Sequence, residues 1–344
     1  MQLKITLAAT LLATAALAQP VQPPPVSSAP VGALLATAPI ITISNDKITA
    51  RVARIDAARG FYNGTRFDQA GVITSLILND KEFYGPWFER TAPEVLDYTY
   101  LGDTIVAGPD SAISGPVEEF APLDFQAKPG LFVKIGVGVL YQPDTQAYDH
   151  YRHYRILDAG QRTTRITKTS VTFTQALSNA GYGYTYEKSL SLTPGKPQLL
   201  ITHRLKNTGT KAIGTTVYDH NFLKLVPGNG GVIVTFPFAV SAANSPAADL
   251  IRVQGNTLTY LRPMANKERI SFPVTGFGTT AADYAFTIKG GGASVSVKGD
   301  QPLTRVNIFS VDRVQSVEPY IDIVLAPGAE KSWTYTYTYA SPKK

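Results

Sequence analysis

The stretch Trp333-Thr334-Tyr335-Thr336-Tyr337-Thr338-Tyr339 alternates an aromatic residue with a threonine at every step. Successive side chains of a β-strand point to opposite faces, so this alternation predicts a strand with one aromatic and one threonine face. Tyr182, Tyr184 and Tyr186 line one face of a second predicted strand in the same way.

Turn signals such as Pro227-Gly228-Asn229-Gly230 separate many further β-rich runs. No capped stretch keeps a helical period, and no fixed repeat indicates a propeller or solenoid. The pattern predicts an all-β protein, a large antiparallel sandwich in one domain. The predicted strands are Val72–Leu78, Phe132–Leu140, Thr164–Thr174, Leu199–Leu205, Thr215–Phe222, Gly231–Phe236, Ser294–Lys298, Val306–Val311 and Ile321–Leu325.

The N-terminal residues have the pattern of an export signal. Lys4 precedes an apolar run from Ile5 to Leu17, and the run ends in a small-x-small cleavage pattern at Ala16-Leu17-Ala18. We therefore predict a signal peptide over 1–18, an extended Pro/Ala-rich linker over 19–39 and the β-sandwich domain over 40–344. The apolar run is too short to cross a bilayer, so we expect an exported protein, periplasmic or secreted, that is soluble after cleavage.

The composition restricts the class of protein. There is no cysteine, so no disulfide stabilises the fold and a large core is needed. The formal net charge is +6, but the basic residues are scattered, and this argues against a nucleic-acid partner, which would require a basic stripe. A monomer is expected, because nothing in the sequence indicates an assembly surface.

Several catalytic motifs are missing, so the candidate groups are the four histidines and the carboxylates. His150 and His153 are three residues apart in a segment expected to be extended, which would direct them to opposite faces and disfavours a metal site. His203 is expected on the surface of a sheet. No metal or other cofactor is predicted.

His220 and Glu318 are the strongest candidates for acid–base chemistry. His220 ends an apolar strand within Asp219-His220-Asn221, and polar residues in such a place are costly unless they are used or fully hydrogen-bonded. Glu318 precedes Pro319 at an expected edge or bulge, where an aromatic, partly buried rim would raise the pKa of its carboxyl. A structural network around His220, and a solvated Glu318, remain the alternatives.

A third cluster combines aromatic and charged residues. Arg66 and Asp68 lie among aromatic residues in a turn-rich segment, and Trp87 follows soon after. Rings that stack on a sugar and charged groups that bind its hydroxyls are typical of carbohydrate recognition. An aromatic core with one buried ion pair is the alternative.

These segments, in their order, resemble the galactose mutarotase (aldose 1-epimerase) superfamily, in its exported or uncharacterised bacterial branch. The resemblance covers about residues 45–340, and each motif alone is weak. The matching segments are Gly64-Thr65-Arg66-Phe67-Asp68, Ala70-Gly71-Val72-Ile73, Gly85-Pro86-Trp87-Phe88-Glu89, Gly115-Pro116-Val117-Glu118-Glu119-Phe120, Phe132-Val133-Lys134-Ile135-Gly136-Val137-Gly138, Tyr218-Asp219-His220-Asn221-Phe222 and Glu318-Pro319-Tyr320-Ile321.

The resemblance implies a twisted two-sheet supersandwich with an open carbohydrate cleft, and catalysis without metal or cofactor. Its acid, a histidine that holds a proton near neutral pH, would be His220, its base would be Glu318, and Arg66 would bind a hydroxyl. The chain departs from the superfamily in its His220-Asn221-Phe222-Leu223 motif and in lacking the second active-site histidine. We expect some of Glu118, Glu119 and Lys134 to enter the cleft.

The sequence predicts an enzyme that acts at the anomeric centre of a sugar by His/Glu acid–base catalysis. A glycosidase or polysaccharide lyase, and a non-catalytic carbohydrate-binding module, are the alternatives on the same fold. The expected partner is a mono- or oligosaccharide. The substrate-binding set predicted around His220 and Glu318 is Arg66, Asp68, Trp87, Glu119, Lys134, Asn221 and Tyr320.

Overall fold

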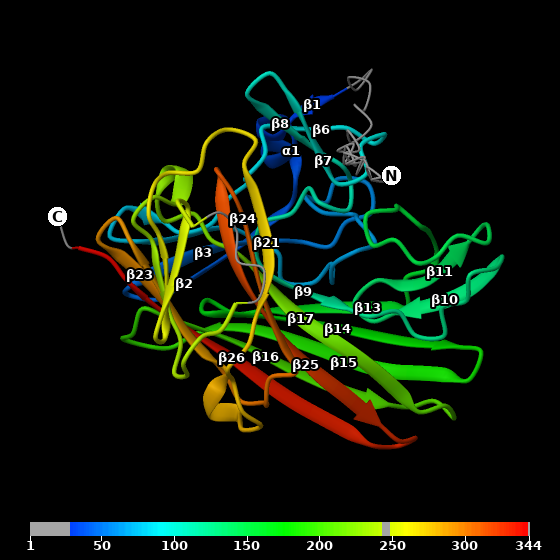
Figure 1. Cartoon of the computed structure of the whole chain (residues 1–344). Helices are drawn as coiled ribbons and strands as arrows, with labels where there is room; N and C mark the ends of the chain where they lie inside the picture. Colours follow the sequence, from blue (N-terminus) through cyan, green and yellow to red (C-terminus); the bar gives the residue numbers. More distant parts are fainter. Residues whose placement is uncertain (1–27, 243–247, 343–344) are drawn as a thin grey trace, which may run out of the picture.

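A computed structural model of the chain describes residues 28–242 and 248–342. The strands form two large sheets and three small ones, and all their pairs are antiparallel except β6 with β8 (Figure 1). The predicted signal peptide, residues 1–18, lies outside the described residues. In the part of the chain that the structure describes, no helix has the length and apolar character needed to cross a membrane.

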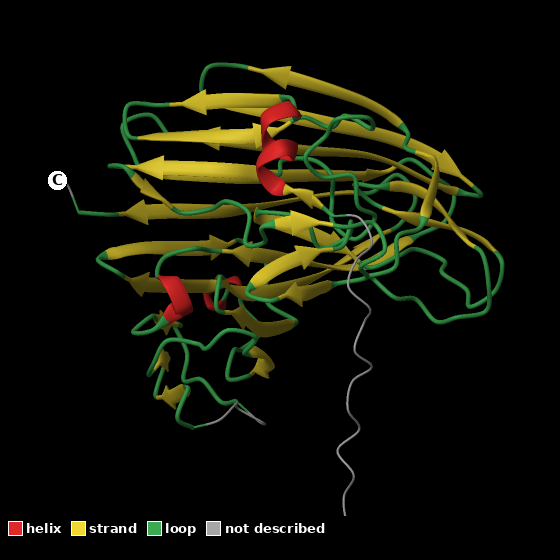
Figure 2. Cartoon of the chain, turned by 90° about the horizontal axis from the view of Figure 1, so that it is seen from above, coloured by secondary structure: helices red, strands yellow, loops and turns green. Residues whose placement is uncertain are grey.

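The largest sheet has ten strands, and its middle is built from the long alternating segments that the sequence predicted (Figure 2). Its order is β13 (Gln161–Ile166), β14 (Ser170–Asn179), β15 (Tyr182–Leu192), β16 (Gln198–Asn207), β26 (Glu330–Ala340), β23 (Ala293–Gly299), β22 (Ala285–Gly290), β18 (Ile233–Thr235), β20 (Thr257–Tyr260) and β19 (Ile251–Gln254).

The second large sheet has five strands, and it carries the site described below. Its order is β21 (Arg269–Val274), β24 (Arg305–Val311), β25 (Val314–Leu325), β17 (Ile213–Phe222) and β9 (Gly115–Phe120). Tyr337 of the large sheet reaches Asp219 of β17, so the two sheets face each other. The main hydrophobic core fills the space between them and includes Val217 and Ile321 from one sheet and Tyr335 from the other.

Three small sheets and short helices complete the fold. The first is β2 (Ile40–Ser44), β3 (Ile48–Ala53), β4 (Ile73–Leu78) and β5 (Lys81–Glu82), and the second is β1 (Ala29–Pro30), β6 (Arg90–Thr91), β8 (Thr104–Ala107) and β7 (Tyr98–Leu101). The third is β10 (Gly130–Lys134), β11 (Gly138–Gln142) and β12 (Arg155–Asp158). The helices are α1 (Val31–Thr37) and two short 3-10 turns, η1 (Pro227–Asn229) and η2 (Ala281–Asp283).

The alternating strands behave as predicted. In β26 the aromatic residues from Trp333 to Tyr339 are buried and the intervening threonines are more exposed. Tyr184 and Tyr186 of β15 are also buried on the core side. The period-2 pattern therefore identified both the strands and their inward faces.

Three predicted segments differ from the structure. The extended linker was expected to continue to Pro39, but α1 occupies Val31–Thr37 and Leu34 and Leu35 pack on a core cluster. This part of the predicted linker is therefore helical. The runs 132–140 and 164–174 were each predicted as one strand, and each is two strands of a hairpin, because neither pattern marks where the chain turns.

Candidate functional site

The face of the five-stranded sheet that points away from the ten-stranded sheet carries polar residues in rows. Arg305 pairs with Tyr320, Tyr320 with Tyr218, and Tyr218 with Glu119, from β24 across to β9. Residues in register on neighbouring strands share a face, so these four side chains form one row.

The next row lies two residues along the strands and contains the predicted acid–base pair. Asn307 is in register with Glu318. His220 lies opposite Glu318, because the strand register is the same on both sides of them. It is set by the Tyr218–Tyr320 pair on one side and by the isolated bridge between Leu223 and Gln315 on the other.

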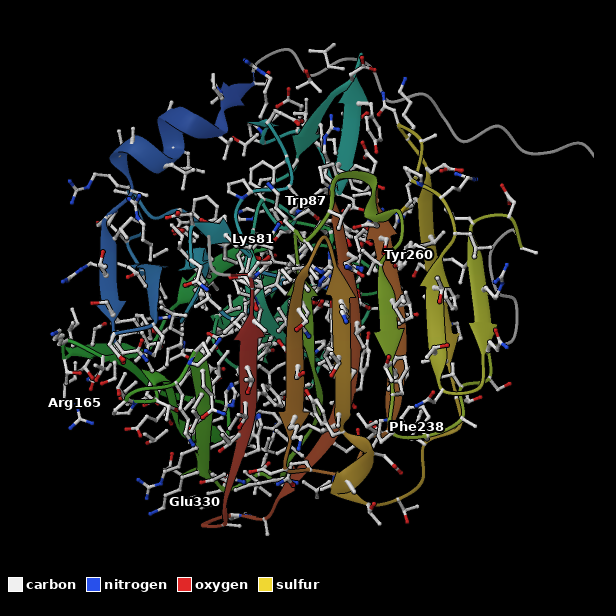
Figure 3. The ribbon with its side chains drawn as sticks, turned by 90° about the vertical axis from the view of Figure 1, so that its left-hand side faces the viewer. Lys81, Trp87, Arg165, Phe238, Tyr260 and Glu330 are labelled. Carbon is white, nitrogen blue, oxygen red and sulfur yellow. The ribbon has the colours of Figure 1, made fainter. Side chains whose placement is uncertain are left out.

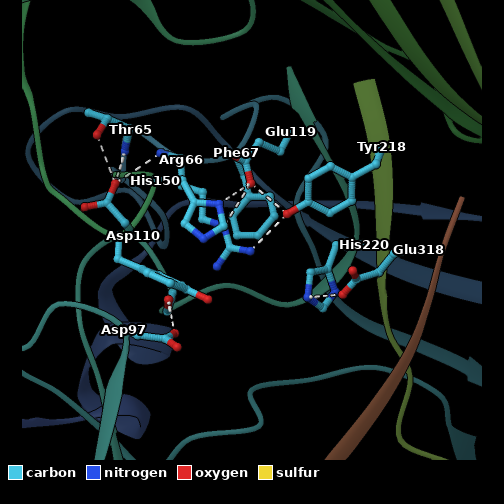
Figure 4. A network of polar contacts seen from close by, with 12 residues as sticks. Thr65, Arg66, Phe67, Asp97, Asp110, Glu119, His150, Tyr218, His220 and Glu318 are labelled. Carbon is cyan, nitrogen blue, oxygen red and sulfur yellow. Dashed lines mark hydrogen bonds and ion pairs between the residues drawn. The ribbon is translucent and has the colours of Figure 1, made fainter. Parts of the chain in front are cut away.

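His220 and Glu318 are in direct contact (Figure 4). The His220 Nε2 atom lies 3.1 Å from Glu318 Oε1, and Asn307 Nδ2 donates to the other carboxylate oxygen at 2.9 Å. The imidazole stacks on the Phe222 ring, with 3.7 Å between the ring centres. Strand register, stacking and the amide donor together fix the orientation of both groups.

Burial changes the pKa of both partners in ways that favour their neutral forms. It raises the pKa of the Glu318 carboxyl from 4.5 to about 7, as the sequence predicted. Burial and the nearby Arg66 guanidinium lower the pKa of His220 well below 6.5. The direction of the His220 shift runs against the expectation that this histidine holds a proton near neutral pH.

Arg66 lies in the wall beside this pair and is held by two partners. Its Nε donates to Glu119 Oε2 at 2.9 Å, and its Nη2 donates to the Tyr218 hydroxyl at 2.9 Å. Lys134 Nζ donates to the other oxygen of Glu119 at 3.2 Å. Burial raises the pKa of the Glu119 carboxyl, but Lys134 and Arg66 outweigh it and hold this pKa well below its usual range.

These residues surround a small pocket of about 140 Å³. Ligand pockets usually measure about 300–1,000 Å³, so this one fits at most a single small ring in the conformation described. Besides His220 and Glu318, it is lined by Arg66, Trp87 and Tyr320. Figure 3 shows Trp87 far from Glu330, where β26 begins.

Five of the nine predicted site residues therefore line one pocket, and four do not. Glu119 and Lys134 lie behind Arg66 and support it from outside the lining. Asn221 is one residue from His220 and so points to the other face of β17, where its amide accepts from Tyr337. Asp68 lies in the interior and accepts from Tyr186 at 3.0 Å.

Asp68 belongs to a buried charge cluster between the two large sheets, which we define as Asp68, Glu118, Lys188 and His203. Lys188 Nζ contacts Glu118 and lies 3.5 Å from Asp68, and His203 Nε2 lies 2.7 Å from Glu118. The prediction of His203 on the sheet surface is wrong, because its side chain is fully buried. Glu118 points into this cluster and away from the pocket.

His150 lies in a turn, His153 lies in the irregular segment that follows, and each has its own carboxylate partner. His150 lines the pocket with its Nδ1 3.5 Å from Glu119, whereas His153 Nδ1 lies 3.1 Å from Asp110. Within residues 28–242 and 248–342, no group of three or more histidine or acidic side chains is arranged to hold a metal ion.

Sequence reasoning missed several residues of the pocket, among them Tyr218, Tyr151, Arg269, Arg305 and Asn307. Arg305 and Asn307 occupy alternate positions of β24, which was predicted only from Val306 onward, and Tyr218 and His220 alternate in the same way on β17. That alternation was the available signal, but it identifies a pocket face only after the neighbouring strands and their register are known.

Known structures share this fold, whereas no protein-family model and no curated protein matches the chain. A galactose mutarotase-like protein from Lactobacillus casei is 15% identical, with a TM-score of 0.50 over 88% of this chain and 100% of that chain. A galactose mutarotase-like protein from Clostridium acetobutylicum is 11% identical, with a TM-score of 0.51 over 88% of this chain and 95% of that chain. An aldose epimerase homologue from C. elegans is 12% identical, with a TM-score of 0.50 over 88% of this chain and 99% of that chain. The chain has the galactose mutarotase-like sandwich fold, and at these identities the likeness is one of fold alone.

Proposed function

We propose that the protein exchanges the two anomers of a sugar, with Glu318 and His220 as one proton-transferring pair. The observation that carries the proposal is their 3.1 Å contact at the wall of a small pocket of about 140 Å³. The pKa of Glu318, at about 7, makes it an effective proton donor near neutral pH, because general acids work best when their pKa is near the operating pH.

The proposed reaction needs two proton transfers at neighbouring oxygens. Neutral His220 takes the proton of the anomeric hydroxyl, the bond from the anomeric carbon to the ring oxygen breaks, and Glu318 protonates that oxygen. The open-chain aldehyde turns and the ring closes by the reverse transfers, so atoms and protons balance. The imidazolium and carboxylate formed halfway lie in contact and stabilise each other.

This assignment exchanges the roles that the resemblance implied for the two residues, and the reason is their environment. A buried imidazole with a lowered pKa is neutral at pH 7 and able to accept a proton, whereas the neutral carboxyl is able to donate one. Arg66 lies close enough to bind a hydroxyl of the same sugar.

The pH dependence of anomer exchange tests the proposal. Because the neutral Glu318 carboxyl is the required form, kcat/KM is expected to fall as the pH rises through about 7, the pKa of that group. The rate of exchange would be measured by NMR from pH 5 to 9, with the uncatalysed rate subtracted at each pH. A rate that rises through pH 7 would overturn the assignment of roles, and no acceleration at any pH would overturn the function.

A non-catalytic sugar-binding module is the second candidate, and the small volume of the pocket favours it. It predicts saturable sugar binding with no anomer exchange. A glycosidase usually needs a second carboxylate across the scissile bond. The other carboxylate in this lining, Asp97, accepts from Ser111 and pairs with Arg269. Because Asp97 already has these partners, the pocket gives the glycosidase hypothesis less support.

We also propose that the protein is exported and works as a monomer. The support for export is the N-terminal sequence pattern, since residues 1–18 lie outside the described part of the chain. Cell fractionation with N-terminal sequencing of the mature chain would test export, with Gln19 as the expected first residue. Light scattering would test the monomer.

A further inference from the structure

The pocket contains three guanidinium groups, and one of them has no carboxylate within ion-pair distance among the described residues. Arg66, Arg269 and Arg305 line the pocket. Arg66 is balanced by Glu119 at 2.9 Å and Arg269 by Asp97 at 3.4 Å. In the described part of the chain, no carboxylate lies within ion-pair distance of Arg305.

Arg305 is nevertheless held in a defined position at the mouth. Its Nη2 donates to the Tyr320 hydroxyl at 2.7 Å, and its guanidinium carbon lies 4.1 Å from the centre of the Tyr320 ring. Tyr320 in turn stacks on Tyr218 at 4.5 Å. A guanidinium has five N–H donors, and the Tyr320 hydroxyl is the one acceptor it meets among the described residues.

Arg305 lies on the same face of the sheet as the proton-transferring pair and lines the same pocket. Arg305 is in register with Tyr320, two residues from Glu318, so Arg305 and Glu318 are diagonal neighbours on one face. The backbone positions of such neighbours are about 7–8 Å apart, and both side chains line the pocket. A pyranose whose ring oxygen lies at Glu318 can therefore place its exocyclic group near Arg305.

We propose that the site takes a sugar carrying an anionic group, which Arg305 binds, with Arg269 beside it. The proposal rests on the proposed function for the position of the anomeric centre. A carboxylate, as in a hexuronic acid, matches the planar fork of a guanidinium and adds little volume to the ring. A phosphate ester shares the chemistry but requires more space in a pocket of about 140 Å³.

Equilibrium binding tests this proposal without depending on catalysis. Calorimetric titration of the protein with glucuronate, glucose 6-phosphate and glucose is expected to give at least tenfold tighter binding of glucuronate than of glucose, weakening at high salt. Tighter binding of the phosphate than of glucuronate would identify the anion as a phosphate. Equal affinity for glucuronate and glucose would overturn the proposal, even if anomer exchange is found.

The Arg305→Gln variant tests whether Arg305 is the residue that binds the anionic group. The variant is expected to weaken glucuronate binding by about tenfold to a hundredfold, because it removes a charge-assisted bond, and to lower the preference for glucuronate over glucose. Arg252→Gln, at an exposed arginine of β19 outside the pocket, is the matched control and should bind like the wild type. An unchanged preference for glucuronate over glucose in Arg305→Gln would exclude Arg305 as the group that binds the anion. Tight glucuronate binding without exchange of any anomer would instead leave this inference standing and remove the proposed function.

Discussion

Glu318→Gln is expected to slow anomer exchange by about 10²–10⁴-fold, the usual contribution of a positioned acid or base. The amide has the shape of the carboxyl but cannot release a proton to the ring oxygen. Because Glu318 is partly protonated near neutral pH, the neutral amide should be accommodated without loss of the fold. The rates of both proteins would be compared by NMR on a freshly dissolved single anomer.

Asp322→Asn is the matched control for this variant. Asp322 lies on the same strand, β25, but its side chain is exposed and accepts from Thr216, away from the pocket. The control should exchange anomers at the wild-type rate. A Glu318→Gln protein with the wild-type rate and an intact fold would contradict the proposed role of this residue.

Glu118→Gln is expected to lower the free energy of unfolding by about 3–5 kcal/mol, the cost of leaving a buried charge without its partner. The change removes the carboxylate that contacts Lys188 and leaves that ammonium in the core with Asp68 at 3.5 Å. His203 also loses its 2.7 Å partner. Urea unfolding at pH 7, followed by circular dichroism, would measure the loss.

Glu330→Gln provides the comparison, because Glu330 pairs with Arg204 at the surface, where solvent screens the interaction. It should unfold almost as the wild type does. Equal stability of the Glu118→Gln and wild-type proteins would show that the buried charge cluster does not act as an interacting unit.

The pH dependence of the stability of the wild-type protein also tests the buried charge cluster. Burial alone would raise the pKa of Glu118, but Lys188 and His203 outweigh it and hold this pKa at about 2, below its ordinary 4.5. The fold therefore favours the ionised form, so this contribution is complete above about pH 4.5 and is lost as the pH falls to about 2. Glu118→Gln should flatten the loss of stability in that range.

The strands and one part of the site could be predicted from single segments. The alternation over Trp333–Tyr339 identifies a strand and its buried face without any knowledge of its neighbours. His220 and Glu318 stand out because a polar group in an apolar strand is costly unless it is used or bonded. Asn221 was wrongly placed beside His220 in the pocket, although its neighbouring position on the strand already directs it to the opposite face.

The remaining features depend on how distant segments meet. His203 has the sequence surroundings of a surface strand residue, and only the packing of the two large sheets brings Glu118 to it. Arg305 joins the pocket because β24 lies beside β25 in one particular register. A shift of one residue would turn Arg305 to the other face, so its role could not be predicted before the strand pairing was known.

The double variant Glu318→Gln/His220→Asn tests the central claim most directly, since the claim is that the two residues act as one unit. Residues that transfer protons together give losses that are far from multiplicative. The account predicts that the double variant exchanges anomers about as slowly as the slower single variant. Losses that multiply would show two independent contributions, and wild-type rates in both folded single variants would show that this pair does not carry the reaction.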